Sequence, residues 1–394
     1  MKNNNIKIIR IIARLNIGGP ARNAVLLTKE LETRGFKTLL VCGEISQGEG
    51  DMRYIAQEYG VRPITIRWLT RELSLKKDFQ AFWDIFSIIW KEKPDIIHTH
   101  TAKAGTLGRL AGICYNLINL IMLRRRRCRL VHTFHGHVFH SYFGKKKTGF
   151  FILVERSLAF FTDRLVTVSS ALQKELTSDF RIAEKDKISV VELGFDLDEL
   201  LKLPHKEEGE VIVVGTVGRL TSIKNHAMLF NVAYNIKSRG LGKKVRFVVV
   251  GDGELGEELE NYAEKLGIKD MIEFKGWIRD LPKIYKELDI VSLTSLNEGT
   301  PVSLIEAMAA GRSVISTNVG GVSDVIEDGK SGYLVTPGNA DEFTEKLMDL
   351  VKDPAKREEF GRNGRILVEK RFSKERLVND MAKLYNDILK KEQR

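Results

Sequence analysis

The sequence predicts an α/β protein made of two doubly wound, Rossmann-like domains with a cleft between them. Apolar, β-rich runs alternate with helix-like stretches, as in a parallel sheet that is covered on both faces. This alternation occurs twice, and a polar segment at residues 201–210, LKLPHKEEGE, separates the two series. A chain of 394 residues with 43% hydrophobic content is long enough to bury two cores.

The two series define the expected domains. Residues 1–200 form an N-terminal domain, residues 201–210 a linker and residues 211–373 a C-terminal domain. A charged helical tail, residues 374–394, is expected to pack back toward the N-terminal domain. The strand-like runs are, in order, IKIIRIIA, TLLVC, DIIHTH, RLVHTFH, RLVTVSS and ISVVEL in the first domain, then VIVVGTVG, VRFVVVGD, MIEFKGW, DIVSLTS and RSVISTN in the second.

The charge of the chain is unevenly distributed. Residues 1–200 hold 32 Lys and Arg against 21 Asp and Glu, whereas the remainder holds 31 of each, so the net charge of +11 belongs to the first half. A basic half indicates an anionic partner. No nucleic-acid module accompanies the charge, so nucleic acid is not expected as that partner. The three cysteines follow no disulfide or metal spacing and the N-terminus lacks a signal-peptide core, which predicts a cytoplasmic protein.

Ligands of doubly wound sheets bind beyond the carboxyl ends of the strands, so the strand-to-helix turns are the candidate sites. Gly18 and Gly19 follow the first strand and permit close backbone approach to a phosphate. Arg219 and Lys224 follow the first strand of the second domain, where two cations can converge on a diphosphate. Tight packing of the glycines and a solvated basic loop are alternatives that these residues alone leave open.

The segment NEGTPVSLIEAMAAG places two carboxylates, Glu298 and Glu306, in an apolar stretch. An unpaired buried carboxylate is costly, so the pair indicates a polar ligand, unless both lie on an exposed helix face. Thr300 is expected to cap a helix whose first residue is Pro301. A ligand with phosphates at this helix start and hydroxyl groups on both sides would suit the two carboxylates, which describes a nucleotide sugar.

The stretch EGTPVSLIE resembles the E-x7-E motif of retaining glycosyltransferases of the GT-B fold, in particular their large family four. The resemblance implies a hexosyltransferase of bacterial surface-polysaccharide assembly. Its donor would be a nucleoside-diphosphate sugar, with UDP favoured over GDP. The segments that resemble the family, in its order, are NIGGPARN, HTHTAKAGTLGRLAG, VHTFHGH, TDRLVTVSS, VGRLTSIKNH, VVVGDGEL, FKGW and GGVSDVIEDGKSGYLV.

The resemblance also implies roles for individual residues. Glu306 would bind the ribose hydroxyls, Glu298 the hydroxyls of the donor sugar, and His135 the reacting sugar. The same-face attack of the acceptor hydroxyl would leave its proton on the departing phosphate, without an enzyme nucleophile. The other donor-binding residues would be Gly18 and Gly19 near the phosphates, Arg219 and Lys224 on the diphosphate, Gly299, Thr300, Pro301 and Val302 along the sugar and phosphates, and Trp277 and Ile278 at the base.

A metal site is the alternative explanation of the histidines around His135. His132, His135, His137 and His140 lie in VHTFHGHVFH, but strand alternation sends His132 and His135 to opposite faces, and no carboxylate or cysteine completes the set. The resemblance likewise implies no cofactor and no divalent metal. The sequence Asp196-Leu197-Asp198 falls at an interdomain turn and is expected to be structural.

Two basic segments predict peripheral binding to the inner face of the cytoplasmic membrane, which fits the lipid-linked glycan acceptor that the family resemblance implies. One follows an apolar stretch, residues 113–123, and the other lies among aromatic residues; both patterns suit an anionic membrane interface. A buried helix followed by a solvated loop is the alternative. The basic residues are Arg124, Arg125, Arg126 and Arg127 in the first segment and Lys145, Lys146 and Lys147 in the second.

Three other functions stay open at this point. A nucleotide-sugar epimerase of the same architecture would release UDP without consuming an acceptor. A transferase acting on a soluble acceptor would not need the membrane. A binding module without activity would have lost donor-site residues, yet the glutamates and the basic pair are all present.

Overall fold

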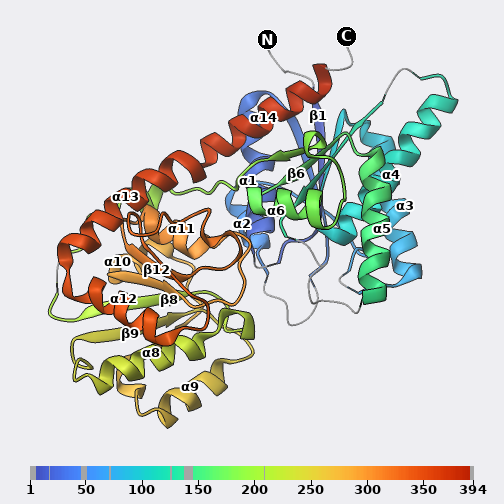
Figure 1. The fold of residues 1–394 in the computed structure, drawn as a ribbon. Helices are drawn as coiled ribbons and strands as arrows, with labels where there is room; N and C mark the ends of the chain where they lie inside the picture. Colours follow the sequence, from blue (N-terminus) through green and yellow to red (C-terminus); the bar gives the residue numbers. More distant parts are fainter. Residues whose placement is uncertain are drawn as a thin grey trace. The chain divides into compact units, whose positions relative to one another are not determined.

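The computed structural model describes residues 6–16, 18–45, 51–70, 72–124, 127–136, 145–207 and 209–390, and only the backbone for residues 145–147. The chain forms two compact units, each built around its own parallel sheet (Figure 1). The first unit is Met1–Phe195 together with Lys374–Arg394, and the second is Asp196–Ser373. The prediction of two doubly wound α/β domains is therefore confirmed.

The first unit contains a seven-stranded parallel sheet with the strand order β3-β2-β1-β4-β5-β6-β7. Its winding reverses next to β1, which leaves the carboxyl ends of β1 and β4 side by side at the switch point where doubly wound sheets bind ligands. The strands are β1 (Lys7–Arg14), β2 (Lys37–Gly43), β3 (Ile64–Ile66), β4 (Ile96–His100), β5 (Arg129–Phe134), β6 (Arg164–Thr167) and β7 (Ile188–Val190).

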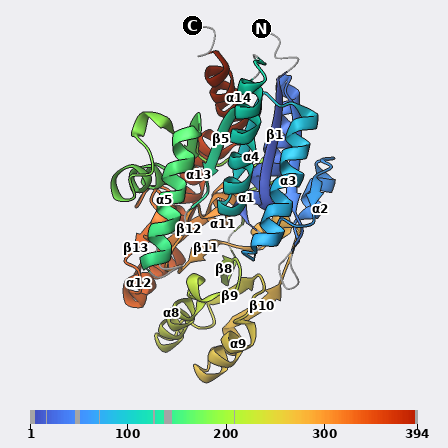
Figure 2. The same ribbon diagram turned by 90° about the vertical axis from the view of Figure 1, so that its right-hand side faces the viewer.

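Alternate residues of β1 enter cores on opposite faces of this sheet. Ile9 and Ile11 pack beneath α3 and α4, whereas Ile8 packs with α1 and α14 and Ile12 with α1 and α2. Figure 2 shows α3 and α4 lying along the sheet beside β1. The helices are α1 (Gly19–Glu30), α2 (Arg53–Glu58), α3 (Leu75–Glu92), α4 (Ala102–Ile121), α5 (Lys145–Phe161), α6 (Ser170–Lys174) and α14 (Lys374–Lys390).

The second unit contains a six-stranded parallel sheet with the order β10-β9-β8-β11-β12-β13, and an apolar cluster packs on one of its faces. Short loops at the carboxyl ends lead from these strands into helices. The strands are β8 (Ile212–Val217), β9 (Val245–Val250), β10 (Ile272–Gly276), β11 (Ile290–Leu293), β12 (Ser313–Thr317) and β13 (Tyr333–Val335). The helices are α7 (Asp198–Leu201), α8 (His226–Ser238), α9 (Gly256–Lys265), α10 (Leu281–Glu287), α11 (Val302–Ala309), α12 (Ala340–Lys352) and α13 (Pro354–Phe372).

The boundary between the units lies before the segment that we expected to be a linker. The described residues of this segment, 201–207 and 209–210, belong to the second unit, where Leu203 and Lys206 are held by specific contacts. Arg365 Nη2 donates to Leu203 O at 2.8 Å, and Lys206 Nζ lies 2.6 Å from Asp289 Oδ2. The tail helix α14 belongs to the first unit, where its apolar face packs on β1, β4, β5 and α1.

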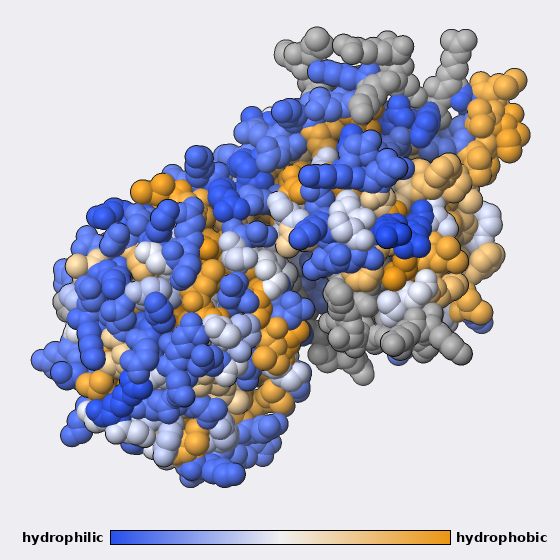
Figure 3. Space-filling view, in the orientation of Figure 1, coloured by the Kyte–Doolittle hydropathy of each residue, from blue (hydrophilic) through white to orange (hydrophobic). Residues whose placement is uncertain are grey.

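The outer side of the α3, α4 and α5 layer is unusually apolar (Figure 3). Ile121 is 79% exposed and Leu123 is 89% exposed at the C-terminal end of α4, and Phe160 is 78% exposed on α5. Within the part of the chain that is described, the longest apolar helix still falls short of what a bilayer crossing requires. These side chains therefore form an exposed apolar surface on the first unit.

Candidate active site

The donor-site residues expected in the second unit gather at the carboxyl edge of its sheet. Arg219 and Lys224 follow β8, Trp277 and Ile278 follow β10, and Glu298 follows β11. Because neighbouring parallel strands end at the same edge, residues far apart in sequence are brought to one side of this unit. The sequence predicted this gathering from strand-to-helix turns alone.

Glu298 and Lys224 form an ion pair at this edge. Lys224 Nζ lies 2.6 Å from Glu298 Oε1, and Ser295 Oγ donates to the same oxygen at 2.6 Å. The Glu298 side chain is 9% exposed, so the charge is shielded from bulk water and depends on these donors. The pair joins the loop after β8 to the loop after β11, and it places a cation and an anion where a ligand would meet both.

Glu306 lies inside α11 and is 5% exposed. The hydroxyl of Tyr285, on α10, lies 2.9 Å from Glu306 Oε2 and 3.1 Å from Ser303 O. Tyr285 itself is fully buried, so it holds the carboxylate against the helix. Sequence inspection missed Tyr285, because its position opposite Glu306 depends on how α10 packs against α11 and no local motif marks it.

Two pairs of loops approach each other so closely that only glycine fits. A side chain at Gly320 or Gly321 would overlap the backbone oxygens of Glu298 and Gly299 respectively, and Gly321 N donates to Glu298 O at 3.0 Å. Gly251 is pressed in the same way on Gly218 O, after β9 and β8. The glycines thus fix the backbone of the loops that carry Glu298 and Arg219.

The remaining expected donor residues are accessible. Arg219, Trp277 and Gly299 are exposed, and Ile278, Thr300 and Val302 are half-buried. The start of the helix differs by one residue from our prediction. Pro301, which is buried, occupies the N-cap position and α11 begins at Val302, because the φ of −77° and ψ of 86° at Pro301 are not helical. Thr300 is therefore not the cap.

In the first unit, the expected residues lie at the carboxyl edge of β1 and β5. Gly18 has a φ of 156°, which favours glycine, and Gly19 begins α1. His135 follows β5, and its Nε2 lies 2.9 Å from His100 Nδ1, at the end of β4. Burial lowers the pKa of His135 to about 4, so its ring is neutral at pH 7. The sequence did not predict His100 as a partner of His135.

The other histidines of that segment separate as strand alternation predicted, where they are described. His132 points to the α4 side, with Nδ1 2.8 Å from Thr99 Oγ1, while His137 and His140 lie outside the described residues. The described ranges contain no group of three or more His, Cys, Asp or Glu side chains that could hold a metal ion. Asp198 begins α7 at the start of the second unit.

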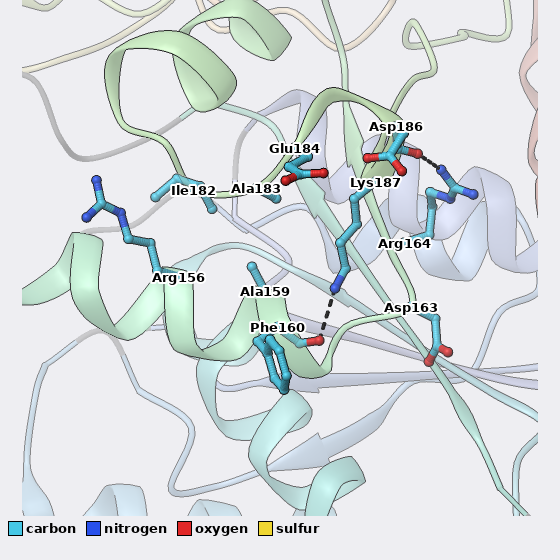
Figure 4. A pocket seen from close by; sticks show the side chains of 10 residues that line it. All are labelled: Arg156, Ala159, Phe160, Asp163, Arg164, Ile182, Ala183, Glu184, Asp186 and Lys187. Atoms are coloured by element: carbon cyan, nitrogen blue, oxygen red, sulfur yellow. Dashed lines mark hydrogen bonds between the residues drawn. The ribbon is translucent and has the colours of Figure 1, made fainter.

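A pocket of about 460 Å³ in the first unit lies away from these residues (Figure 4). It is lined by residues at the C-terminal end of α5 and the amino ends of β6 and β7, which is the opposite edge of the sheet from His135. Lys187 Nζ spans it to donate to Phe160 O at 3.0 Å. Its other cations, Arg156 and Arg164, likewise donate to backbone oxygens, those of Phe180 and Asp186.

The expected membrane residues are only partly described. Arg124 is exposed and its guanidinium lies over the Trp90 ring, 5.6 Å from the centroid. Arg127 pairs with Asp163 at 3.0 Å while remaining exposed. Arg125 and Arg126 lie outside the described residues, and Lys145, Lys146 and Lys147 form the first turn of α5 with side chains that are not described.

Two family models match adjoining segments of the chain. Glycosyltransferase Family 4 matches residues 17–199, and Glycosyl transferases group 1 matches residues 199–367. The chain is 29% identical over 358 residues to the UDP-Gal:alpha-D-GlcNAc-diphosphoundecaprenol alpha-1,3-galactosyltransferase of Escherichia coli, covering 88% of each chain. It is 27% identical over 336 residues to the capsular polysaccharide biosynthesis glycosyltransferase CapM of Staphylococcus aureus, covering 82% of this chain and 84% of CapM.

Solved structures agree on the fold. A glycosyltransferase from Rickettsia africae superposes with a TM-score of 0.78 at 19% identity, covering 98% of this chain and 99% of its own. Anabaena HepE in complex with UDP superposes with a TM-score of 0.77 at 20% identity, covering 97% and 100%. Fold and matches together define the class of this protein: it is a glycosyltransferase with the GT-B fold. Within that class the chain belongs to the family-four type.

Proposed function

We propose that this glycosyltransferase moves a hexose-type sugar, with retention, from a UDP-sugar to a hydroxyl group of a lipid-linked saccharide. The observation that carries the proposal is the arrangement around the start of α11, where the Lys224–Glu298 pair and the buried Glu306 flank one helix N-terminus. Free backbone N–H groups there favour phosphate. Carboxylates on either side favour hydroxyl groups, which a nucleotide sugar presents at both ends.

Lys224 and Arg219 would neutralise the diphosphate as the glycosidic bond breaks and negative charge grows on the leaving group. Without a ligand, Lys224 is held by Glu298 at 2.6 Å. A bound phosphate would compete for Lys224, and Glu298 would then accept hydrogen bonds from sugar hydroxyls. Glu306, fixed by Tyr285, would accept them from the ribose.

The chemistry follows from these contacts. The acceptor oxygen forms the new bond to the anomeric carbon on the face from which the diphosphate leaves, and a phosphate oxygen of the leaving group takes the acceptor proton. His135, which is neutral at pH 7, would hydrogen-bond the reacting sugar without adding positive charge. No cofactor and no divalent ion is part of this proposal, because the two cations carry the charge of the leaving group.

UDP and a lipid-linked acceptor are favoured by the relatives. The Escherichia coli relative is named for UDP-Gal and a diphosphoundecaprenol-linked acceptor, and the Anabaena structure holds UDP. We extend both features to this chain. GDP-sugars, a soluble acceptor and an epimerase reaction are the alternatives against which the proposal is tested.

The decisive experiment is a thermal-shift panel of UDP-, GDP- and ADP-sugars, followed by turnover of the stabilising donor. Glu306→Gln should weaken donor and free UDP alike, by about tenfold, because a charged hydrogen bond to the ribose is worth roughly 1.5–3 kcal/mol. The matched control is Glu359→Gln, an exposed glutamate of the same unit. Stabilisation by GDP-sugars alone would refute the donor assignment, and UDP release without an acceptor would identify the epimerase.

We also propose that the first unit rests on an anionic membrane. Residues 101–150 contain ten Lys or Arg and no Asp or Glu, which accounts for nearly all of the net charge of +11. In the same region, Ile121 and Leu123 are largely exposed and adjoin the basic segment. Apolar side chains that insert and cations that meet lipid phosphates are the two components of interfacial binding, at about 1 kcal/mol per basic residue.

Liposome flotation in low and high salt tests this attachment. The protein should float with anionic vesicles, and replacing residues 124–127 with glutamine should reduce the bound fraction. The control replaces the same number of exposed cations in the second unit, Lys243, Lys244, Lys265 and Lys286. Equal binding to neutral vesicles, or equal loss in the control, would contradict the proposal.

A further inference from the structure

A chain of buried polar side chains crosses the α14 side of the first sheet. It begins at Arg10, in the middle of β1, which is fully buried. Arg10 Nη1 donates to Thr28 Oγ1 at 2.9 Å and Nη2 donates to Tyr385 OH at 3.1 Å. Among the described residues, no carboxylate pairs with this guanidinium and its Nε has no acceptor. A buried cation that is held only by hydroxyl groups lowers stability, so a functional role for Arg10 is worth seeking.

The hydrogen bonds from Arg10 have only one possible direction. A guanidinium only donates, so the Tyr385 oxygen accepts from Arg10 and its own proton points at His98 Nδ1, 2.6 Å away. Burial raises the pKa of Tyr385, so the hydroxyl keeps this proton. His98 Nδ1 is therefore the acceptor.

The tautomer of His98 follows from that direction. Burial first, then the charge of Arg10, lowers the pKa of His98 well below its usual value, so the ring is neutral. With Nδ1 accepting, its single proton must be on Nε2, which lies 2.7 Å from Thr133 Oγ1 and donates to it. Tyr385 and Thr133 thus hold the His98 ring at both nitrogens.

His98 in turn contacts the pair at the edge of the sheet. Its ring centroid lies 4.3 Å from that of His100, and the His100 ring stacks on His135 at 5.2 Å. Burial lowers the pKa of His100 well below its usual value, and the neighbouring histidines and Arg10 lower it further. The bond between His100 and His135 therefore joins two neutral rings. His135 Nδ1 has no partner within the described ranges.

We propose that Tyr385 and Arg10 are positioning residues for His135, acting through His98 and His100. The helix α14, at the far end of the chain, thereby sets the orientation of the side chain that meets the reacting sugar. This inference rests on the proposed function, because it takes His135 as the group in contact with that sugar. At the His135 end of this series of contacts, Nδ1 is buried and has no hydrogen-bond partner within the described ranges.

Tyr385→Phe is the first test, since it removes one hydroxyl and keeps the ring that packs on Phe36. We expect kcat to fall by about tenfold or more while the donor KM is unchanged, as when the group that orients a functional histidine is lost. ¹⁵N imidazole spectra should show His98 protonated on Nε2 in the wild type and a mixture of tautomers in the variant. Tyr115→Phe, in the core on the opposite face of the same sheet, is the matched control. It should change neither kcat nor the imidazole spectrum of His98.

The pH dependence of kcat supplies a second readout. Arg10→Met removes the buried charge that lowers the pKa of His98 and His100, so the acidic decline in kcat should begin at higher pH than in the wild type. Arg10→Lys keeps the charge and should retain the wild-type position of that decline. The titratable groups that face His100 are His98 on β4, Arg10 on β1 and His135 beyond β5, and Tyr385 faces His98 from α14. The charge of His132, which points to the opposite face of the sheet, also acts on His100.

The outcomes separate this inference from the proposed function. A folded Tyr385→Phe with wild-type kcat and an unchanged His135 spectrum would overturn the positioning role and leave the transferase assignment intact. A wild type that turns over no nucleotide sugar would refute the proposed function. The spectra of His98 and His135 would still show whether Tyr385 positions His135. If Tyr385→Phe fails to fold, Thr133→Val removes the other hydrogen bond of His98 and should give the same loss.

Discussion

The two sheets share a doubly wound topology but differ in what their central strands bury. In the first unit, β1, β4 and β5 carry Arg10, His98, His100 and His132 into the interior. In the second unit, β8, β11 and β12 are fully described and hold only apolar residues, glycine, Ser and Thr. The expected donor-site residues of this unit lie instead in the loops and the helix that follow these strands. In the first unit, polar residues thus continue from the candidate site into the sheet, whereas the candidate site of the second unit follows strands with apolar side chains, Ser and Thr.

This difference predicts which substitutions damage the fold and which damage only activity. In the second unit, a loop residue can be changed while the apolar cluster beneath it stays intact. In the first unit, the polar side chains are themselves part of the packing, so a change affects both. The predictions that follow are ordered from the largest expected effect to the smallest.

Glu155→Gln should have the largest effect, on the stability of the first unit. Arg109 Nη2 donates to both Glu155 oxygens, at 2.9 and 2.7 Å, and both side chains are buried. Removing the carboxylate leaves the Arg109 charge without its partner, which costs about 3–5 kcal/mol. Urea unfolding followed by tryptophan fluorescence reports this, since three of the four tryptophans lie in the first unit.

The control for that measurement is the exposed pair of the second unit, Lys202 and Glu199. Glu199→Gln should change the free energy of unfolding by less than about 1 kcal/mol, because water screens the pair. Similar losses of unfolding free energy in Glu155→Gln and Glu199→Gln would mean that the stability of the first unit does not depend on its buried ion pair.

Glu298→Ala should have the next largest effect, and on turnover rather than stability. Loss of a well-placed contact in the transition state costs about 10²-fold or more in rate. The Lys224 side chain is 23% exposed and can be solvated once the carboxylate is lost, so the melting temperature should change little. Lys224→Ala and Arg219→Ala should also lower activity with the fold intact. Wild-type turnover in Glu298→Ala would remove the carboxylate from the proposed mechanism.

Acidification should have the smallest effect per group and should act mainly on the first unit. In the first unit, burial lowers the pKa values of four histidines: His98, His100, His132 and His135. In the described part of the second unit, burial lowers the pKa of one histidine, His226, to about 4. Unfolding raises each to about 6.5, so the unfolded chain binds more protons below that pH.

Stability is therefore fully present above about pH 6.5 and declines as the pH falls toward 4, by up to about 1.4 kcal/mol per histidine per pH unit. Hydrogen exchange followed by mass spectrometry, expressed as protection factors from pH 8 to 5, measures each unit separately. Amides of the first sheet should lose protection sooner. Parallel decline in both sheets would show that the buried histidines do not control acid sensitivity.

The sequence predicted the parts of the site that are built from short segments. Turns after strands, the glycines beside them and the Glu298 and Glu306 spacing could all be identified, because each involves neighbours in the chain. The hydrogen-bond partners of these residues could not be identified from the sequence. Tyr285 reaches Glu306 from another helix, and Tyr385 reaches His98 across a sequence separation of 287 residues. Such contacts depend on strand register and helix packing, which alternation of apolar residues does not specify.

The boundaries failed for a related reason. The polar composition of residues 201–210 predicted a linker, and in the structure Arg312 and Arg365 donate to the backbone oxygens of Pro204 and Leu203 and hold these residues on the second unit. Composition indicates exposure to water and cannot reveal which distant arginine binds a carbonyl group. The same limit placed the start of α11 one residue too early.

The return of α14 to the first unit has a consequence for synthesis. A ribosome that has made residues 1–195 has produced every strand of the first sheet, but not the helix that supplies Leu377, Met381 and Tyr385 to its core. Domains generally fold as they emerge, N-terminal first. Here the first sheet can complete its interior only after the whole second unit has been translated. Until then the apolar residues that α14 covers stay exposed, and exposed apolar surface of this kind promotes aggregation during folding.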